Sequence, residues 1–209
     1  MNEKNSLGLD KCFLDFDSPF ELFKNWMKEA IKNEINDPNA LSLATTDKSG
    51  KPSVRMVLLK GINEEGFIFY TNLKSKKSLD LKENPQASMC FYWKSLFRQV
   101  RITGSISRVT NGEADNYFNS RNYESKIGAW ASAQSSFLKS RNDLLIAIAE
   151  YKKKYPDQNN VPRPKHWGGW NLLPKEIEFW LRINDRIHER LIYSRKEEDD
   201  NWEKNLLYP

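Results

Sequence analysis

The sequence has few of the residues that hold metals or disulfides, and no long apolar run. It contains two cysteines and two histidines among 209 residues, too few for a disulfide framework and without metal-ligand spacing. The mean hydropathy is −0.74, and no apolar run approaches the roughly 20 residues that span a bilayer. The N-terminal residues lack a signal-peptide core. We therefore expect a cytoplasmic protein without a metal and without a membrane partner.

The charge balance is mildly basic. Thirty-three basic and 28 acidic residues leave a net charge of +5 and a pI near 9.0. Because no long basic tract is present, a nucleic-acid partner is an alternative rather than a requirement. The motifs of serine nucleophiles, P-loops and dinucleotide-binding loops are also missing. An enzyme with this sequence would take its reactivity from a cofactor.

The length suits one domain. Residues 1–17 show no periodicity and are predicted to be a flexible N-terminal arm, so that residues 18–209 form the domain. Ser18 and Pro19 are typical of a helix start. An apolar stripe follows them at helical spacing, consisting of Phe20, Phe23, Met27, Ala30 and Ile31.

Short β-runs then recur between turn signals and predict an antiparallel barrel or sandwich, mainly β with flanking helices. The predicted strands are Ala40–Thr45, Val54–Leu59, Phe67–Thr71, Ala87–Trp93, Val100–Val109, Ile177–Ile183 and Ile187–Tyr193. Helices are predicted over 113–121 and from about Ser135 to Tyr155. An acidic turn, 197–200, precedes the last residues.

In the stretch from Lys51 to Lys77, four cations stand at the strand positions and element ends of a predicted hairpin and helix start. Ser75 is a good N-cap, so Lys76 and Lys77 stand in the first turn of a helix, where positive charge is unfavourable unless an anion binds there. The alternative is a solvated lysine pair. Arg55, in an otherwise apolar strand, favours an anion, and a phosphate fits best.

Lys60 is the fourth cation, five residues after Arg55. In a regular strand this spacing places the two side chains on opposite faces. We therefore expect them to hold different parts of a long ligand, or two ligands.

A second set of polar residues is spaced for a helix. Tyr117, Arg121 and Ser125 recur at four-residue intervals and would form one stripe if the helix continues that far. Two hydroxyls and a guanidinium suit a phosphate. The alternative is a tyrosine packed on the barrel beside an arginine in an ion pair.

A third set alternates along the last predicted strand. Arg186, His188 and Arg190 would share one face, either facing a bound anion or forming the solvent face of an edge strand. Gln99 would place an amide where it reads a ring edge, and Trp180 could form a flat wall of a ring pocket. The alternative for Gln99 is an amide that only satisfies backbone groups, and the alternative for Trp180 is core packing.

Several separated motifs resemble one family, the pyridoxamine 5′-phosphate oxidases, which use FMN. The resemblance runs from about Ser18 to Pro209. It is carried by RMVLLKG (55–61), FYTNLKSKK (69–77), RQV (98–100), YFNSR (117–121), IGAWASAQSS (127–136), HWGGW (166–170), IEFW (177–180) and RIHER (186–190). The family usually has arginine where Lys76 stands and aspartate where Glu189 stands.

The resemblance implies an FMN-binding split β-barrel that forms a homodimer with two FMN sites at the subunit interface. It assigns to FMN the residues Arg55, Met56, Lys60, Tyr70, Thr71, Ser75, Lys76, Lys77, Gln99, Gln134, Ser135, Trp180 and Arg190. It assigns to the substrate Lys60, Tyr117, Arg121, Ser125, Arg186 and His188. Arg186 and His188 are the catalytic candidates because they contact the substrate ring.

The implied reaction is oxidation of pyridoxamine or pyridoxine 5′-phosphate to pyridoxal 5′-phosphate, with dioxygen reduced to peroxide. Nucleic acid is not an expected partner. One alternative is a flavin binder of another specificity, against which the substrate set of Tyr117, Arg121, Ser125, Arg186 and His188 argues. The other is a basic barrel that binds nucleic acid through exposed aromatic rings.

Overall fold

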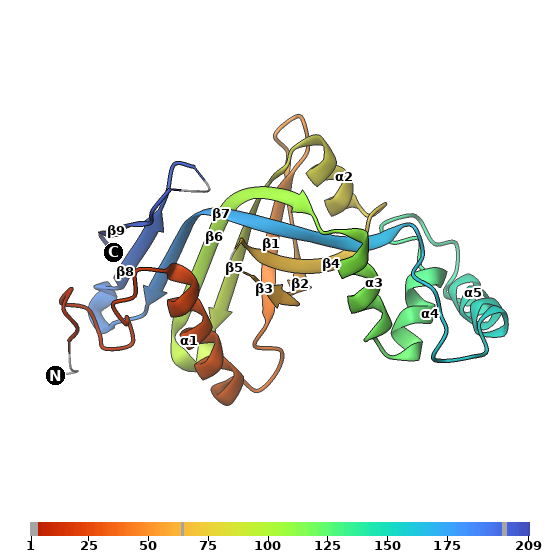
Figure 1. Ribbon diagram of the computed structural model, residues 1–209, viewed down its shortest axis with the longest axis horizontal. Helices are drawn as coiled ribbons and strands as arrows, with labels where there is room; N and C mark the ends of the chain where they lie inside the picture. The colour runs from red at the N-terminus through yellow and green to blue at the C-terminus, as the bar shows by residue number, and fades with distance from the viewer. Residues whose placement is uncertain (1–3, 64, 198–199) are drawn as a thin grey trace.

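The computed structural model describes residues 4–63, 65–197 and 200–209 (Figure 1). Its elements in chain order are α1 (Pro19–Asn33), β1 (Ala40–Thr46), β2 (Pro52–Leu58), β3 (Gly61–Ile62), β4 (Phe67–Asn72), α2 (Lys76–Glu83), β5 (Gln86–Trp93), η1 (Lys94–Leu96), β6 (Arg98–Arg108), α3 (Asn111–Asn119), α4 (Tyr123–Ala131), α5 (Arg141–Lys154), β7 (Trp167–Leu181), η2 (Asn184–Arg186), β8 (Glu189–Ser194) and β9 (Glu203–Leu206). The predicted acidic turn falls partly on residues 198–199, which lie outside the described residues.

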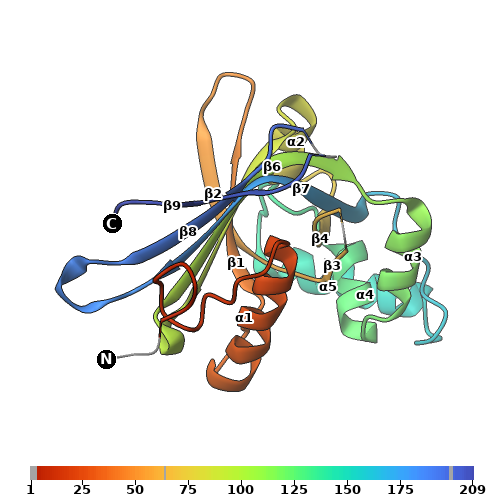
Figure 2. The same ribbon diagram turned by 60° about the vertical axis from the view of Figure 1, so that its left-hand side comes forward.

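The strands form one curled antiparallel sheet. Its order is β2-β1-β5-β6-β7-β4-β3, and β8 pairs with β7 and β9. The two longest strands, β6 and β7, run side by side through its middle (Figure 1). The helices α3, α4 and α5 lie at one end of the sheet, and β8 and β9 lie at the other in both views (Figures 1 and 2). The prediction of a mainly β fold with flanking helices is confirmed.

The core lies between α1 and the inner face of the sheet. Phe23 of α1 is fully buried, and its ring centroid lies 4.9 Å from that of Phe67 and 5.1 Å from that of Phe91. Four residues of the predicted stripe are buried, and their packing stabilises the helix, whereas Ile31 is 63% exposed. Within the described residues, every helix is too short or too polar to cross a bilayer.

The described part of the predicted N-terminal arm packs against this core. Phe13 is fully buried and meets the Trp26 ring edge-on at a centroid distance of 5.2 Å. The Trp26 Nε1 donates a 2.7 Å hydrogen bond to the carbonyl of Cys12, and the Tyr193 hydroxyl donates a 2.8 Å bond to that of Phe16. A boundary between arm and domain at residue 17 stays a prediction.

The predicted hairpin is wrong in its pairing. The predicted strand Val54–Leu59 corresponds to β2, which pairs with β1, while β4 pairs with β3 and β7. Only Gly61–Ile62, after the end of β2, folds back on β4. Strands that are adjacent in sequence need not be neighbours in a sheet, since pairing is decided by the whole core.

Strand β7 begins at Trp167, ten residues before the predicted start at Ile177. The glycines after Trp167, which permit close backbone approach or a bulge, lie inside this strand. A Cβ on Gly169 would lie 2.8 Å from the Tyr70 ring, so glycine is required for β4 and β7 to approach at this point.

The helical segment is also divided differently from the prediction. Helix α3 ends at Asn119, and α4 starts afresh because the Asn122 side chain accepts a 2.8 Å hydrogen bond from the Ser125 amide. The next helix begins at Arg141, not at Ser135. Tyr117, Arg121 and Ser125 therefore lie on two helices and the turn between them, not on one stripe.

The packing of Phe23 yields a stability prediction. Phe23→Ala leaves a cavity among three aromatic rings and should lower the free energy of unfolding by about 3–5 kcal/mol. Chemical denaturation at one fixed protein concentration measures the change. Ile35→Ala, at a residue that is 92% exposed, is the matched control and should change it little. Equal effects of the two substitutions would contradict this placement of the core.

Candidate functional site

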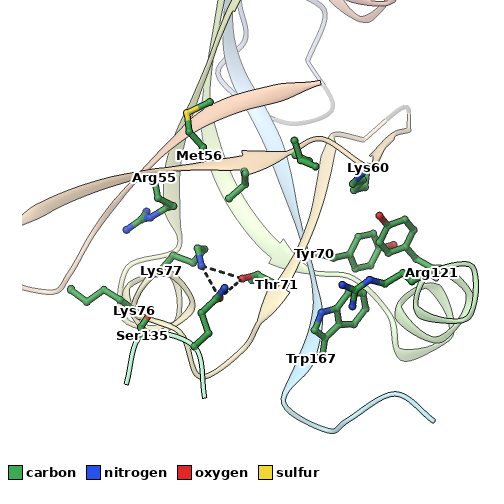
Figure 3. Close-up of a pocket in the computed structure, with 14 residues that line it drawn as sticks. Arg55, Met56, Lys60, Tyr70, Thr71, Lys76, Lys77, Arg121, Ser135 and Trp167 are labelled. Atoms are coloured by element: carbon green, nitrogen blue, oxygen red, sulfur yellow. Dashed lines mark hydrogen bonds between the residues drawn. The ribbon is translucent and has the colours of Figure 1, made fainter. Parts of the chain in front are cut away.

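A cavity of about 510 Å³ opens between β2, β4, α2 and α3 (Figure 3). Its volume falls within the range of cofactor pockets. It is lined by Arg55, Met56, Val57, Leu58, Lys60, Tyr70, Thr71, Lys76, Lys77, Tyr117, Arg121, Gln134, Ser135 and Trp167. Eleven of these residues belong to the predicted cofactor and substrate sets. The cations of this cavity are far apart in the sequence, since Arg121 comes 66 positions after Arg55, yet they line the same cavity.

Lys77 is the most buried cation of the cavity, with 8% of its surface exposed. Its Nζ donates hydrogen bonds to Thr71 Oγ1 at 3.2 Å and to Gln134 Oε1 at 3.0 Å (Figure 3), and a third to Ser75 Oγ at 3.3 Å. All three acceptors are neutral. Burial, aided by repulsion from Arg55, lowers the pKa of Lys77 to about 8. A buried ammonium without a carboxylate partner among the described residues is a strong attractor for an anion.

The predicted capping role of Ser75 is wrong, although Ser75 does stand at the N-cap position of α2. Its side chain makes no cap bond. Its Oγ donates instead to the Asn72 carbonyl at 2.7 Å and accepts from Lys77. The hydroxyl therefore helps to hold Lys77, and α2 starts without a side-chain cap.

Three aromatic rings stack along the other side of the cavity. The Tyr70 ring lies 4.1 Å from Tyr117 and 5.3 Å from Trp167, nearly parallel to both. The guanidinium carbon of Arg121 lies 4.9 Å from the centre of the Trp167 ring (Figure 3). Among the described residues, the buried Arg121 Nη1 has no hydrogen-bond partner, and burial lowers the pKa of the guanidinium. The Arg121 side chain also lines the cavity, so it is placed to pair with an anion bound there.

Lys60 lies two residues after the end of β2 at Leu58, so the expectation that Lys60 and Arg55 face opposite sides of one strand is wrong. Both line the same cavity. Ser125 lines an adjoining hollow of about 320 Å³ that shares Tyr70, Thr71, Arg121, Gln134 and Trp167 with the first. Ser125 and Arg121 therefore line the same adjoining hollow.

The remaining predicted residues gather elsewhere, in what we call the C-terminal cluster: Gln99, Trp180, Arg186, His188 and Arg190. Gln99, Trp180 and Arg190 are direct neighbours across β6, β7 and β8. The His188 ring lies 4.7 Å from that of Trp180. Among the described residues that line the main cavity, none belongs to this cluster. It occupies the end of the sheet opposite α3 and α4 (Figures 1 and 2).

The prediction that Arg186, His188 and Arg190 share a strand face is wrong. Arg186 lies in the turn η2 with φ at 61°, and β8 begins only at Glu189. A positive φ in a non-glycine residue is uncommon and is enriched at functional sites. Arg190 is in the strand, where its Nε donates a 2.8 Å hydrogen bond to the buried Glu178.

Sequence reasoning left Asp80 without a role and gave Trp167 only a general one, as one of the tryptophans that could supply a flat wall. Trp167 does form a wall of the cavity. Asp80 was passed over, yet it lies four residues after Lys76 on α2 and bonds to it at 2.7 Å. That four-residue spacing is a recognisable signal for an ion pair on a helix.

Comparison with known sequences places this cavity in a family. Residues 27–155 match the family described as pyridoxamine 5′-phosphate oxidase, and residues 167–209 match the pyridoxine 5′-phosphate oxidase C-terminal dimerisation region. The chain belongs to the pyridoxamine 5′-phosphate oxidase family. It is 61% identical over 209 residues to a pyridoxine/pyridoxamine 5′-phosphate oxidase of Pelagibacter ubique, covering 100% of both chains. It is 50% identical over 197 residues to that of Sinorhizobium fredii, covering 94% and 95%.

Solved structures agree with this membership. PhzG from Burkholderia lata, solved with tetrahydrophenazine-1-carboxylic acid, superposes with a TM-score of 0.88 at 31% identity, covering 95% of this chain and 96% of that one. An FMN-binding protein of Nostoc punctiforme, related to pyridoxamine 5′-phosphate oxidase, superposes with a TM-score of 0.73 at 15% identity, covering 92% and 98%. The predicted split β-barrel fold is confirmed.

The cofactor of the pyridoxamine 5′-phosphate oxidase family is FMN, and the donors of the cavity fit it. FMN ends in a phosphate, which needs several cationic donors. Lys77 supplies a buried ammonium with neutral partners, while Arg55 and Lys76 stand beside it on the same cavity wall. A flavin also needs a polar slot for its ribityl chain, which Gln134 and Ser135 border.

The lowered pKa of Lys77 predicts how FMN binding responds to pH. The free protein loses the Lys77 proton above about pH 8, whereas the phosphate favours the charged ammonium, so binding must take up a proton there. The dissociation constant of FMN should therefore rise up to about tenfold per pH unit above pH 8. Flavin fluorescence quenching measures it.

Lys77→Arg is the control for this effect, because arginine stays charged over the whole range. Its dissociation constant should vary much less with pH than that of the unmodified protein. A constant affinity of the unmodified protein between about pH 7 and 9.5 would contradict the assignment of Lys77 to the phosphate.

Proposed function

We propose that this protein oxidises pyridoxamine 5′-phosphate and pyridoxine 5′-phosphate to pyridoxal 5′-phosphate. The alcohol and dioxygen give the aldehyde and hydrogen peroxide, and the amine also consumes water and releases ammonia. Bound FMN supplies the hydride acceptor and passes the electrons on to dioxygen. The contribution of the protein is to bind two phosphates and to orient two rings.

The observation that carries this proposal is the presence of two separate anion positions on one cavity. Lys77, with Arg55 and Lys76 near it, forms the first, which we assign to the FMN phosphate. The orphaned Nη1 of Arg121 marks the second, which we assign to the substrate phosphate. A pocket for a single phosphorylated ligand would need only one of them.

The second position has the parts of a phosphate site. Arg121 is held over the Trp167 ring by a cation–π contact, so its guanidinium is already oriented. Tyr117 and Lys60 line the same cavity, and Ser125 borders the adjoining hollow. The stacked rings of Tyr70 and Tyr117 give the second position a flat apolar wall.

The C-terminal cluster enters the site from a second copy of the chain. Residues 167–209, which carry all of this cluster except Gln99, match a dimerisation region. The edge strand β2 exposes Val54 and Met56, which are 69% and 63% exposed, on the side of the sheet that the helix α1 leaves uncovered. In the homodimer, Gln99, Trp180 and Arg190 would contact the flavin, while Arg186 and His188 would contact the substrate ring. The roles of Arg186 and His188 are the catalytic part of this proposal.

We also propose that the protein works in the cytoplasm. Cys12 and Cys90 are both free thiols in the folded chain, as is usual in a reducing compartment. Burial raises the pKa of Cys12 to about 12, so this thiol is unreactive.

An assay of the purified protein tests the proposed reaction. The protein should be yellow and should release one peroxide for each pyridoxal 5′-phosphate formed from either substrate. Tetrahydrophenazine-1-carboxylic acid serves as the comparison, because PhzG has the same fold. A colourless protein that binds nucleic acid would support the alternative barrel, and a yellow protein inactive on both vitamers would support a flavin binder of another specificity.

The second anion position yields a kinetic prediction. Arg121→Gln should raise the KM for pyridoxamine 5′-phosphate by about 10- to 100-fold, because it removes a charged hydrogen bond to the substrate phosphate. The FMN content should not change. Steady-state kinetics and the visible spectrum measure the two quantities. Arg141→Gln, at the exposed start of α5, is the matched control. Loss of FMN with an unchanged KM would reverse the assignment of the two phosphates.

The shared site yields a complementation prediction. Arg121→Gln damages the cavity, and Arg186→Gln damages the C-terminal cluster. A heterodimer of the two variants has one site with both defects and one intact site, so it should regain about half of the activity of the unmodified dimer. Differently tagged chains, co-expressed and purified for both tags, provide the sample. Activity no higher than the mean of the two parent variants would show that each site is built from one chain.

A further inference from the structure

Asp80 is a buried carboxylate beside the cations assigned to the FMN phosphate. Its side chain is 2% exposed. Its Oδ2 accepts hydrogen bonds from Thr45 Oγ1 at 2.8 Å and from Ser53 Oγ at 3.0 Å. Its Oδ1 accepts from the Lys76 Nζ at 2.7 Å. A negative charge at this place is unexpected, since it opposes the anion that the cavity is built to bind.

Arg55 is bonded to the same two hydroxyl groups. Its Nη1 donates to Thr45 Oγ1 at 2.7 Å and to the Leu43 carbonyl at 3.1 Å, and its Nη2 donates to Ser53 Oγ. The Nη2 lies 3.8 Å from Asp80 Oδ2, so the main connection between the two charged groups runs through the hydroxyls.

These hydrogen bonds have a direction. An ionised carboxylate can only accept, so the hydroxyl protons of Thr45 and Ser53 point to Asp80 and their lone pairs point to Arg55. A guanidinium can only donate, so it needs those lone pairs. Burial alone would raise the pKa of Asp80, but hydrogen bonds from Lys76, Thr45 and Ser53 outweigh it and hold the pKa below its usual value. The carboxylate is therefore ionised at neutral pH, as this arrangement requires.

We propose that Asp80 is a positioning residue for FMN, which fixes Arg55 through Thr45 and Ser53 and holds Lys76 until the cofactor phosphate binds. This inference rests on the proposed function, because it assigns the cavity to FMN. Arg55 and Lys76 then play different parts. The Arg55 side chain is 20% exposed and has several bonds that keep it in place. The Lys76 side chain is 53% exposed, and its ammonium forms an ion pair with Asp80. Because the ammonium lies near the surface, replacing Asp80 by a phosphate as its partner costs little free energy.

The lysine at position 76 suits this exchange. Lysine four residues before an aspartate on a helix forms an ion pair that a flexible ammonium can leave. The cation that stays fixed in this site is Arg55, because several hydrogen bonds hold its guanidinium.

Asp80→Asn separates this role from simple electrostatics. Removal of a nearby negative charge should by itself tighten FMN binding, whereas loss of the ordered Arg55 should weaken it. We expect the FMN dissociation constant to rise at least about tenfold, mainly through faster release from the holoenzyme. Flavin fluorescence after dilution measures the release. An unchanged or tighter dissociation constant would overturn the proposal.

Asp47→Asn is the matched control. Asp47 also acts on Lys76 electrostatically, but its carboxylate bonds to Ser49 and to the Lys51 amide and not to the hydroxyls that hold Arg55. Asp47→Asn removes one negative charge, as Asp80→Asn does, so FMN release from the Asp47→Asn variant should be unchanged or slower than from the unmodified protein. Faster release from both variants to the same extent would show an effect of net charge or folding, and not of Asp80.

Two further variants test the route through Arg55. Thr45→Val keeps the side-chain shape and the charge of Asp80 but removes one hydroxyl that connects Asp80 to Arg55. FMN release should therefore be faster in this variant too. If Asp80→Asn does not fold, Thr45→Val tests the positioning role of Asp80 instead. In an Arg55→Gln background, Asp80→Asn should cause little further loss. Full additivity of the two losses would overturn the proposal. If the unmodified protein bound no FMN, the proposed function would fail first, and the two failures are thus distinguishable.

Discussion

The buried ammonium of Lys77 is the constraint on which the site depends. Its hydrogen-bond acceptors come from β4, from the start of α2 and from the loop at Gln134, and all of them are neutral. A charge held in this way costs free energy that a bound phosphate returns. The curled sheet serves this arrangement, because β7 holds β4 in place and the N-terminus of α2 follows β4 directly.

The cavity separates its anion positions by a stack of aromatic rings. The phosphate end near Lys77 carries cations on strand and helix, while Arg121 stands beyond Tyr70 and Tyr117, over Trp167. Two flat ligands with charged tails can lie against this wall with their rings side by side. In the proposed function, the chain binds and orients both molecules, and the C-terminal cluster of a second copy would close the site from the other side.

The types and spacing of the charged residues predicted which side chains line the cavity better than the sequence pattern predicted which strands pair. Arg55 and Lys77 were found because cations are unusual where they stand. The pairing of β2 was missed because it depends on distant residues. The start of β7 was missed because glycine is uncommon in strands, although the Tyr70 ring requires it at position 169. Asp80 was missed because an acidic residue does not by itself indicate an anion-binding site. Its role depends on hydrogen bonds from Ser53 and Thr45, which lie 27 and 35 positions away in the sequence.

A crystal structure of the protein with FMN and pyridoxal 5′-phosphate tests the account most directly. Two phosphates should appear on each cavity, one bonded to Lys77 and Arg55 and the other to the Nη1 of Arg121, which is without a partner in the unliganded chain. The rings should lie between them, against Tyr70 and Tyr117. A single phosphate shared by both groups, or Lys77 and Arg55 turned to solvent, would contradict it.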